Sequence, residues 1–82
     1  MMNIHYFARY REVLGVPSET MEWDPTLVTL NDLRKKLAAR GGVWVVLEER
    51  NLMCALNQEL CGLDSRLQAE DEVAFFPTVT GG

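Results

Sequence analysis

The chain has 82 residues, of which 48% are hydrophobic and 24% are charged, with a formal net charge of -4 at pH 7. This length suits one small domain, and this hydrophobic content is too high for an intrinsically disordered segment. The acidic balance disfavours binding to nucleic acid or to anionic membranes, because both require a basic surface.

The N-terminal part of the sequence predicts two strands separated by a helical turn. Residues 2–8 predict a strand with Ile4 and Tyr6 on one face and His5 and Phe7 on the other. Residues 11–14 add a helical turn, which a glycine and a proline then end. Residues 19–23 predict the second strand.

The clearest helix is predicted over residues 30–40. Thr29 is a suitable N-cap, and Asp32 stands three residues on as a variant of the capping box. Three leucines share one face at helical spacing, which indicates that this face is buried. Gly41 is expected to end the helix as a left-handed cap.

Residues 43–50 are ambiguous, because their β-branched content suggests a strand and their apolar spacing a short helix. We favour the helix. After it, residues 52–56 and 59–61 predict a hairpin around a tight turn at Asn57-Gln58, and residues 63–71 predict a loop. Residues 72–76 predict the last strand, with Phe75 on the core face and Phe76 on the other.

This order of elements predicts an α+β protein with a β-grasp (ubiquitin-like) fold. The first and last strands should lie parallel at the centre of a mixed sheet of about five strands, joined through a right-handed crossover. The one main helix should cover one face and leave the other open. We expect residues 1–76 to form this domain and residues 77–82 to form a flexible, extended tail.

No export signal or membrane segment is expected. The N-terminus lacks a basic stretch followed by an apolar one, and the longest apolar run, residues 43–47, is too short to span a bilayer. The two cysteines, Cys54 and Cys61, match neither a disulfide scaffold nor a zinc motif. We therefore expect a cytoplasmic protein.

The end of the chain is the main candidate functional site. The sequence stops at Thr80-Gly81-Gly82, so the last glycine is expected to carry a free carboxylate. Gly81 can adopt backbone angles closed to other residues, and residues 77–82 reach at most about 20 Å when extended. Such a tail suits insertion into a narrow channel of another protein.

A docking surface is expected beside the tail. Phe7 and Phe76 fall opposite the core-facing residues of the first and last strands, so these two rings should form one exposed aromatic patch. Such a patch is typical of a protein interface. The alternative is that one of the two phenylalanines belongs to the core.

The sequence contains no catalytic or cofactor-binding constellation. It has no phosphate-binding glycine loop, no Ser/His/Asp set and no paired catalytic carboxylates, and His5 is its only histidine. The acidic residues 70–72 are expected to form a solvated turn rather than a metal site. Cys54 is expected to be a small buried residue rather than a thiol relay. These features favour a carrier without a bound cofactor or metal over an enzyme.

Three stretches resemble the small subunits of molybdopterin synthase, and the resemblance covers essentially the whole chain. They are residues 6–15 (YFARYREVLG), 55–58 (ALNQ) and 71–82 (DEVAFFPTVTGG). The resemblance implies a β-grasp fold and a sulfur-carrying role in molybdenum cofactor biosynthesis, as a non-catalytic subunit of a heterotetrameric synthase.

The resemblance also implies partners and site residues. An adenylating enzyme related to ubiquitin activators would use ATP and magnesium to activate the carboxylate of Gly82. A sulfur donor protein would then leave a thiocarboxylate, which enters the large, catalytic subunit and gives its sulfur to cyclic pyranopterin monophosphate. By position in the family, Leu60 and Arg11 would join Phe7 and Phe76 at the interface.

Two other functions share the same tail chemistry. One is a sulfur carrier for thiamine synthesis or tRNA thiolation, which differs only in the acceptor enzyme. The other is a ubiquitin-like modifier that joins its last glycine to a lysine of another protein.

Overall fold

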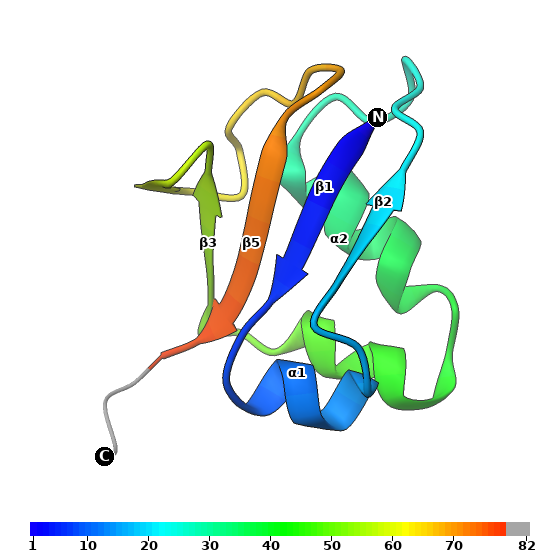
Figure 1. Ribbon diagram of the computed structural model, residues 1–82, viewed down its shortest axis with the longest axis vertical. Coiled ribbons are helices and arrows are strands. Elements are labelled where there is room, and N and C mark those ends of the chain that lie inside the picture. Colours follow the sequence, from blue (N-terminus) through cyan, green and yellow to red (C-terminus); the bar gives the residue numbers. More distant parts are fainter. Residues whose placement is uncertain (79–82) are drawn as a thin grey trace.

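Five strands form one mixed sheet in the computed structural model, which describes residues 1–78 (Figure 1). The strands are β1 (Met2–Tyr6), β2 (Ser18–Met21), β3 (Leu52–Leu56), β4 (Glu59–Cys61) and β5 (Glu72–Pro77). Their order is β2-β1-β5-β3-β4. The central strands β1 and β5 are parallel, with Ile4 opposite Val73, and the other pairs are antiparallel. The predicted β-grasp fold is confirmed.

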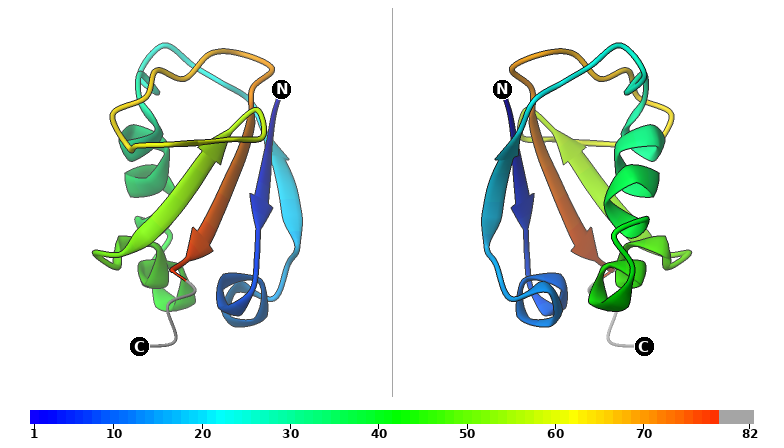
Figure 2. Two further views of the ribbon diagram at one scale, coloured as in Figure 1. Left: turned by 90° about the vertical axis from the view of Figure 1, so that its left-hand side faces the viewer. Right: turned by 90° about the vertical axis from the view of Figure 1, so that its right-hand side faces the viewer.

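The helices are α1 (Arg9–Leu14), α2 (Leu30–Ala38) and the 3-10 helix η1 (Gly42–Glu48). Figure 2 shows α2 lying along one face of the sheet, and in the described part of the chain no helix covers the other face. The core fills the space between α2 and the sheet. Its largest fully buried side chains are Tyr6, Tyr10, Phe75, Met2, Ile4, Leu30, Leu33, Leu37, Leu47 and Val73.

The capping box predicted for α2 is present. The Thr29 hydroxyl accepts a hydrogen bond from the Asp32 amide at 3.3 Å, and the Asp32 carboxylate accepts one from the Thr29 amide at 3.0 Å. The helix ends at Ala38, two residues before its predicted end. Gly41 has φ +78° but ψ -172°, so the predicted left-handed cap is wrong; the glycine instead leads the chain into η1.

Other predicted boundaries shift because the sheet limits its strands. β1 ends at Tyr6, since Ala8 has φ +55° and turns the chain into α1, which begins two residues earlier than expected. β2 stops at Met21, which is opposite Met2, because β1 offers no partner beyond that residue. The helix favoured for residues 43–50 is confirmed as the 3-10 helix η1, which ends two residues earlier than expected.

Two buried tyrosines each donate a hydrogen bond to a glutamate that also forms an ion pair with an arginine. Tyr6 donates to Glu19 at 2.8 Å, and Arg40 binds both Glu19 oxygens at 2.9 Å. In the same way, Tyr10 donates to Glu49 at 2.9 Å, and Arg9 binds both of its oxygens. These networks satisfy the buried tyrosines and connect β2 with the end of α2, and α1 with the end of η1.

Replacing Glu19 should make the free energy of unfolding vary less with pH in the acid range. The Arg40 guanidinium holds the pKa of Glu19 below its ordinary value of 4.5. Its ionised form therefore stabilises the fold above about pH 5, and this contribution disappears as the pH falls through the lowered pKa. For Glu19→Gln we expect a loss of about 1–3 kcal/mol in the free energy of unfolding at pH 7.

Urea unfolding of both proteins across the acid range checks this expectation. The difference between the native chain and Glu19→Gln should shrink as the pH falls. Glu22→Gln is the matched control, because the Glu22 side chain is exposed and belongs to neither network. A difference that stays constant down to acid pH would contradict the role given to Glu19.

No helix within residues 1–78 is both long enough and apolar enough to cross a membrane.

Candidate docking face and carrier tail

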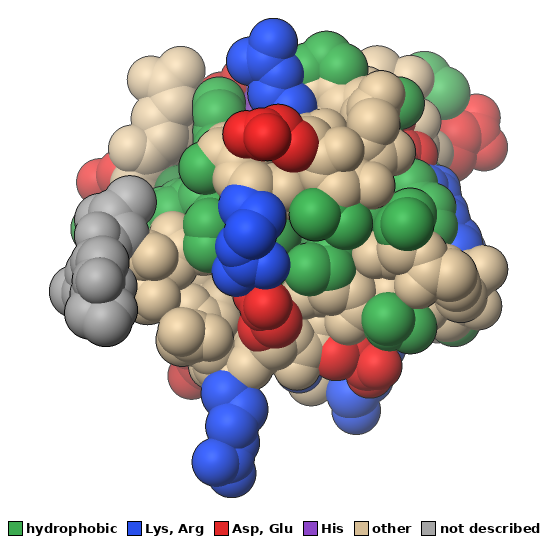
Figure 3. Space-filling model, turned by 90° about the horizontal axis from the view of Figure 1, so that it is seen from below, with side chains coloured by type: hydrophobic (Ala, Val, Ile, Leu, Met, Phe, Trp, Pro, Cys, Tyr) green, Lys and Arg blue, Asp and Glu red, His purple; other side chains and the backbone are tan. Residues whose placement is uncertain are grey.

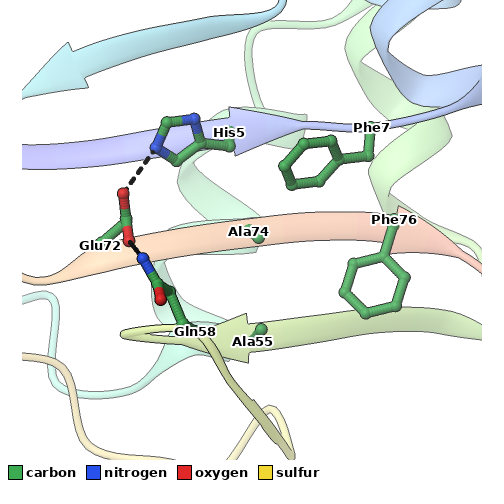
Figure 4. A pocket seen from close by; sticks show the side chains of 7 residues that line it. All are labelled: His5, Phe7, Ala55, Gln58, Glu72, Ala74 and Phe76. Atoms are coloured by element: carbon green, nitrogen blue, oxygen red, sulfur yellow. Dashed lines mark hydrogen bonds and ion pairs between the residues drawn. The ribbon is translucent and has the colours of Figure 1, made fainter.

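The open face of the sheet holds a shallow pocket of about 280 Å³ (Figure 4). This volume is just below the usual range of small-molecule sites, about 300–1,000 Å³, and leaves room for a few side chains of a partner. The pocket spans β1, β5 and the β3–β4 hairpin. Its lining consists of His5, Phe7, Ala55, Gln58, Glu72, Ala74 and Phe76.

The sheet register explains the hollow. Ala74 on β5 is opposite His5 on one side and Ala55 on the other, so small side chains form the floor. Larger side chains stand at both ends, with Phe7 and Phe76 at one end and Glu72 at the other (Figure 4). A depression results where the two alanines meet.

The aromatic end of the pocket, formed by Phe7 and Phe76, lies beside the end of β5. Figure 4 shows the rings of Phe7 and Phe76 on the same side of the sheet. Phe7 is 49% exposed and Phe76 is half-buried, whereas Phe75 is fully buried on the helix side. The alternation inferred from the sequence is therefore confirmed, and neither Phe7 nor Phe76 is a core residue. Their role in binding a partner stays a prediction.

The other end of the pocket is polar. The His5 Nε2 atom lies 3.1 Å from the Glu72 carboxylate, and Gln58 Nε2 donates to the same carboxylate at 3.4 Å. His5 lies on the open face, as expected. Gln58 and Glu72 were not predicted at this surface, because only the pairing of β3 with β5 brings the Asn57-Gln58 turn beside Glu72.

Leu60 and Arg11 lie outside the pocket lining. Leu60 on β4 is 70% exposed and opposite Ala55, which places it on the pocket side of the sheet at its edge. Arg11 is exposed on α1. Both remain predictions as interface residues.

The end of the molecule from which β5 leaves carries mixed surface chemistry. Figure 3 views this end, where α1 and η1 lie, and shows hydrophobic side chains among basic and acidic ones. Val13 on α1 and Val43 and Val45 on η1 are among the exposed large hydrophobic residues.

Four of the six residues of the predicted tail, residues 79–82, lie outside the described residues. Thr80, Gly81 and Gly82 are among these four residues. The last described residue is Thr78, whose hydroxyl accepts a hydrogen bond from Asn51 at 3.1 Å. Pro77 belongs to β5 and is opposite Leu52. The chain therefore leaves the sheet at Thr78, two residues after Phe76 and one later than the predicted boundary, next to the aromatic end of the pocket.

Residues 1–78 contain no group of three or more His, Cys, Asp or Glu side chains that could hold a metal ion. In the predicted acidic turn, Glu70 is exposed, and its Oε1 atom lies 2.6 Å from the N-terminal nitrogen of Met1. Glu72, by contrast, belongs to β5 and lines the pocket.

Comparison with known proteins decides the family. Residues 4–82 match the ThiS family. The chain belongs to the ThiS family. It is 42% identical to the molybdopterin synthase sulfur carrier subunit of Haemophilus influenzae and 40% identical to that of Escherichia coli, with 100% of this chain and of each relative covered. The resemblance inferred from the sequence motifs is confirmed.

A solved structure supports the same fold for this ThiS-family chain. The crystal structure of SAMP1 (small archaeal modifier protein 1) from Haloferax volcanii has a TM-score of 0.75 at 26% identity, covering 99% of this chain and 98% of that chain.

Proposed function

We propose that this ThiS-family chain is the sulfur carrier subunit of a molybdopterin synthase and acts in molybdenum cofactor biosynthesis. The observation that carries the proposal is the identity of 42% over the full length of a relative with that name. An open apolar pocket at the root of the predicted tail supports it, because a carrier needs a docking surface beside its reacting end.

The reacting group in this proposal is the carboxylate of Gly82. A carboxylate is a poor electrophile, since its charge repels nucleophiles and oxide is a poor leaving group. An adenylating enzyme related to ubiquitin activators would transfer AMP from ATP, with magnesium, to give an acyl-adenylate and pyrophosphate. Sulfur from a donor protein would then displace AMP and leave a thiocarboxylate.

The carrier itself then supplies position and not catalysis. Its thiocarboxylate would enter the large subunit and donate sulfur to cyclic pyranopterin monophosphate, and two carriers per pterin would complete the dithiolene of molybdopterin. Gly81 and Thr80 would pass through the entry channel with Gly82. A cytoplasmic location, expected from the cysteine pattern, is part of the same proposal.

The docking surface in this proposal is the pocket with its aromatic end. Phe7 and Phe76 would supply the apolar contacts, and Leu60 would extend them along the sheet edge. Arg11 on α1 would contact the partner beside the tail root. The acidic net charge of -4 favours a partner with a basic surface around this contact.

Mass spectrometry of the C-terminal tryptic peptide tests the proposal. Trypsin cleaves after Arg66 and releases residues 67–82, which contain neither Met nor Cys. Incubation with the adenylating enzyme, ATP, magnesium and a sulfur donor should replace one oxygen of Gly82 by sulfur. Methionine oxidation, which has nearly the same mass change, cannot occur in this peptide. An unchanged peptide with a competent adenylating enzyme would contradict the proposal.

A ubiquitin-like modifier is the second candidate, favoured by the similarity to small archaeal modifier protein 1. It would join Gly82 to lysines of other proteins through an isopeptide bond. Isolation of such conjugates from cells, without any thiocarboxylate form, would favour this function over sulfur transfer.

A further inference from the structure

Cys54 and Cys61 lie side by side in the hairpin formed by β3 and β4. They are directly opposite in the antiparallel register, and their Sγ atoms are 3.8 Å apart. Opposite residues have Cα atoms about 4.5–5.5 Å apart. This separation falls within the range of about 4.4–6.8 Å that a disulfide requires. Both cysteines are free thiols.

The pair lies on the helix side of the sheet, away from the pocket. Cys54 is 2% exposed, as expected for a small buried residue, and its Sγ donates to the Cys61 carbonyl at 3.3 Å. Cys61 packs against the edge of the core and is partly accessible. Neither thiol has a role in the proposed sulfur transfer.

We propose that Cys54 and Cys61 are a redox modification site, which forms an intramolecular disulfide when the protein meets a low-molecular-weight disulfide such as oxidised glutathione. The two-residue turn at Asn57-Gln58, where both φ angles are positive, holds the strands in the register that places the thiols together. The site is therefore built by the hairpin and needs no large rearrangement to close.

Disulfide formation would proceed through two successive thiol–disulfide exchanges. Burial and the neighbouring Cys61 raise the pKa of the Cys54 thiol to about 12, so the more accessible Cys61 attacks first. Its thiolate forms a mixed disulfide with half of the oxidant and releases one glutathione thiol. Cys54 then loses its proton and attacks the Cys61 sulfur, which releases the second glutathione thiol. The protein loses two electrons and the oxidant gains them.

The crosslink would act on a short strand at the edge of the sheet. β4 has three residues, lies at the sheet edge and pairs with β3 alone, and such strands open locally at low cost in free energy. Ala55 and Leu60 stand next to the cysteines and face the pocket side. A disulfide would therefore hold this edge of the docking face in place, a consequence that, unlike the disulfide itself, rests on the proposed function.

Peptide mapping of the full chain tests the proposal, because Glu59 stands between the two cysteines. The native protein is equilibrated in a buffer of oxidised and reduced glutathione, its remaining thiols are alkylated, and it is digested with a protease that cleaves after glutamate. We expect the peptides on either side of Glu59 to stay joined, and dithiothreitol to separate them. In the Cys61→Ser variant the same peptides should separate without reductant.

A second measurement tests whether the folded hairpin favours the disulfide. The equilibrium ratio of disulfide to dithiol should be at least about tenfold higher in the native protein than in denaturant, in the same glutathione buffer. An equal or lower ratio would overturn the proposal. So would separate glutathione adducts on the two cysteines, or covalent dimers, with the peptides around Glu59 unlinked.

Discussion

Shifting the terminal carboxylate by a single residue is expected to abolish sulfur transfer. Removing Gly82, or adding one alanine after it, moves the reacting group by about 3.3–3.6 Å. Misplacement by about 1 Å can already cost a hundredfold in rate, so thiocarboxylate formation and molybdopterin synthesis should both fall by more than about 100-fold. A reconstituted synthase assay with the purified activating enzyme measures both steps.

The fold should tolerate these changes, because the tail follows the last strand and the core lies between α2 and the sheet. The free energy of unfolding should stay within about 0.5 kcal/mol of the native value. The matched control adds the same alanine before Met1, which should leave sulfur transfer unchanged. Normal transfer by the chain lacking Gly82 would refute the carrier proposal.

A charge placed on the aromatic end of the pocket is expected to prevent assembly with the large subunit. Phe76→Asp and Phe7→Asp each put a carboxylate where an apolar contact is proposed. Aromatic residues at the centre of an interface contribute about 2–4 kcal/mol, so the dissociation constant should rise roughly 30- to 1,000-fold. Isothermal titration calorimetry with the large subunit measures the effect.

Two checks separate lost docking from lost folding. Phe7 is 49% exposed, so Phe7→Asp should keep the native circular dichroism spectrum even if the half-buried Phe76 proves less tolerant. Val28→Asp is the matched control, because Val28 is 42% exposed and lies before α2, outside the pocket. Native affinity in a folded Phe7→Asp variant would show that the partner binds elsewhere.

The strands and the main helix could be predicted because their signals are local. Alternation along residues 2–6 and 72–76 separated core from surface, and the capping box at Thr29 marked the start of α2. The predicted boundaries were less accurate. β2 ends at Met21 because its partner Met2 is the first residue of β1, and α1 begins where Ala8 turns the chain. Those limits depend on neighbours far away in the sequence.

The pocket could be predicted only in part. The parity of Phe7 and Phe76 follows from period-two alternation along single strands, and the structure places both on the open face. The polar end could not be foreseen, because His5, Gln58 and Glu72 meet only when β1, β5 and the hairpin share one sheet. Interactions between the turn and β5 leave no local signal in either segment.

By itself, the sequence determined the fold class, the face that each central strand buries and the glycine-ended terminus that is proposed to carry sulfur. Only the tertiary structure decided which residues line the pocket on the open face. It also decided that Glu19 and Glu49 accept hydrogen bonds from two buried tyrosines, and that Cys54 lies opposite Cys61. The physical reason is the range of the interactions. Alternation and capping act within a few residues, whereas side-chain partners across a sheet are set by strand register, which the whole core selects.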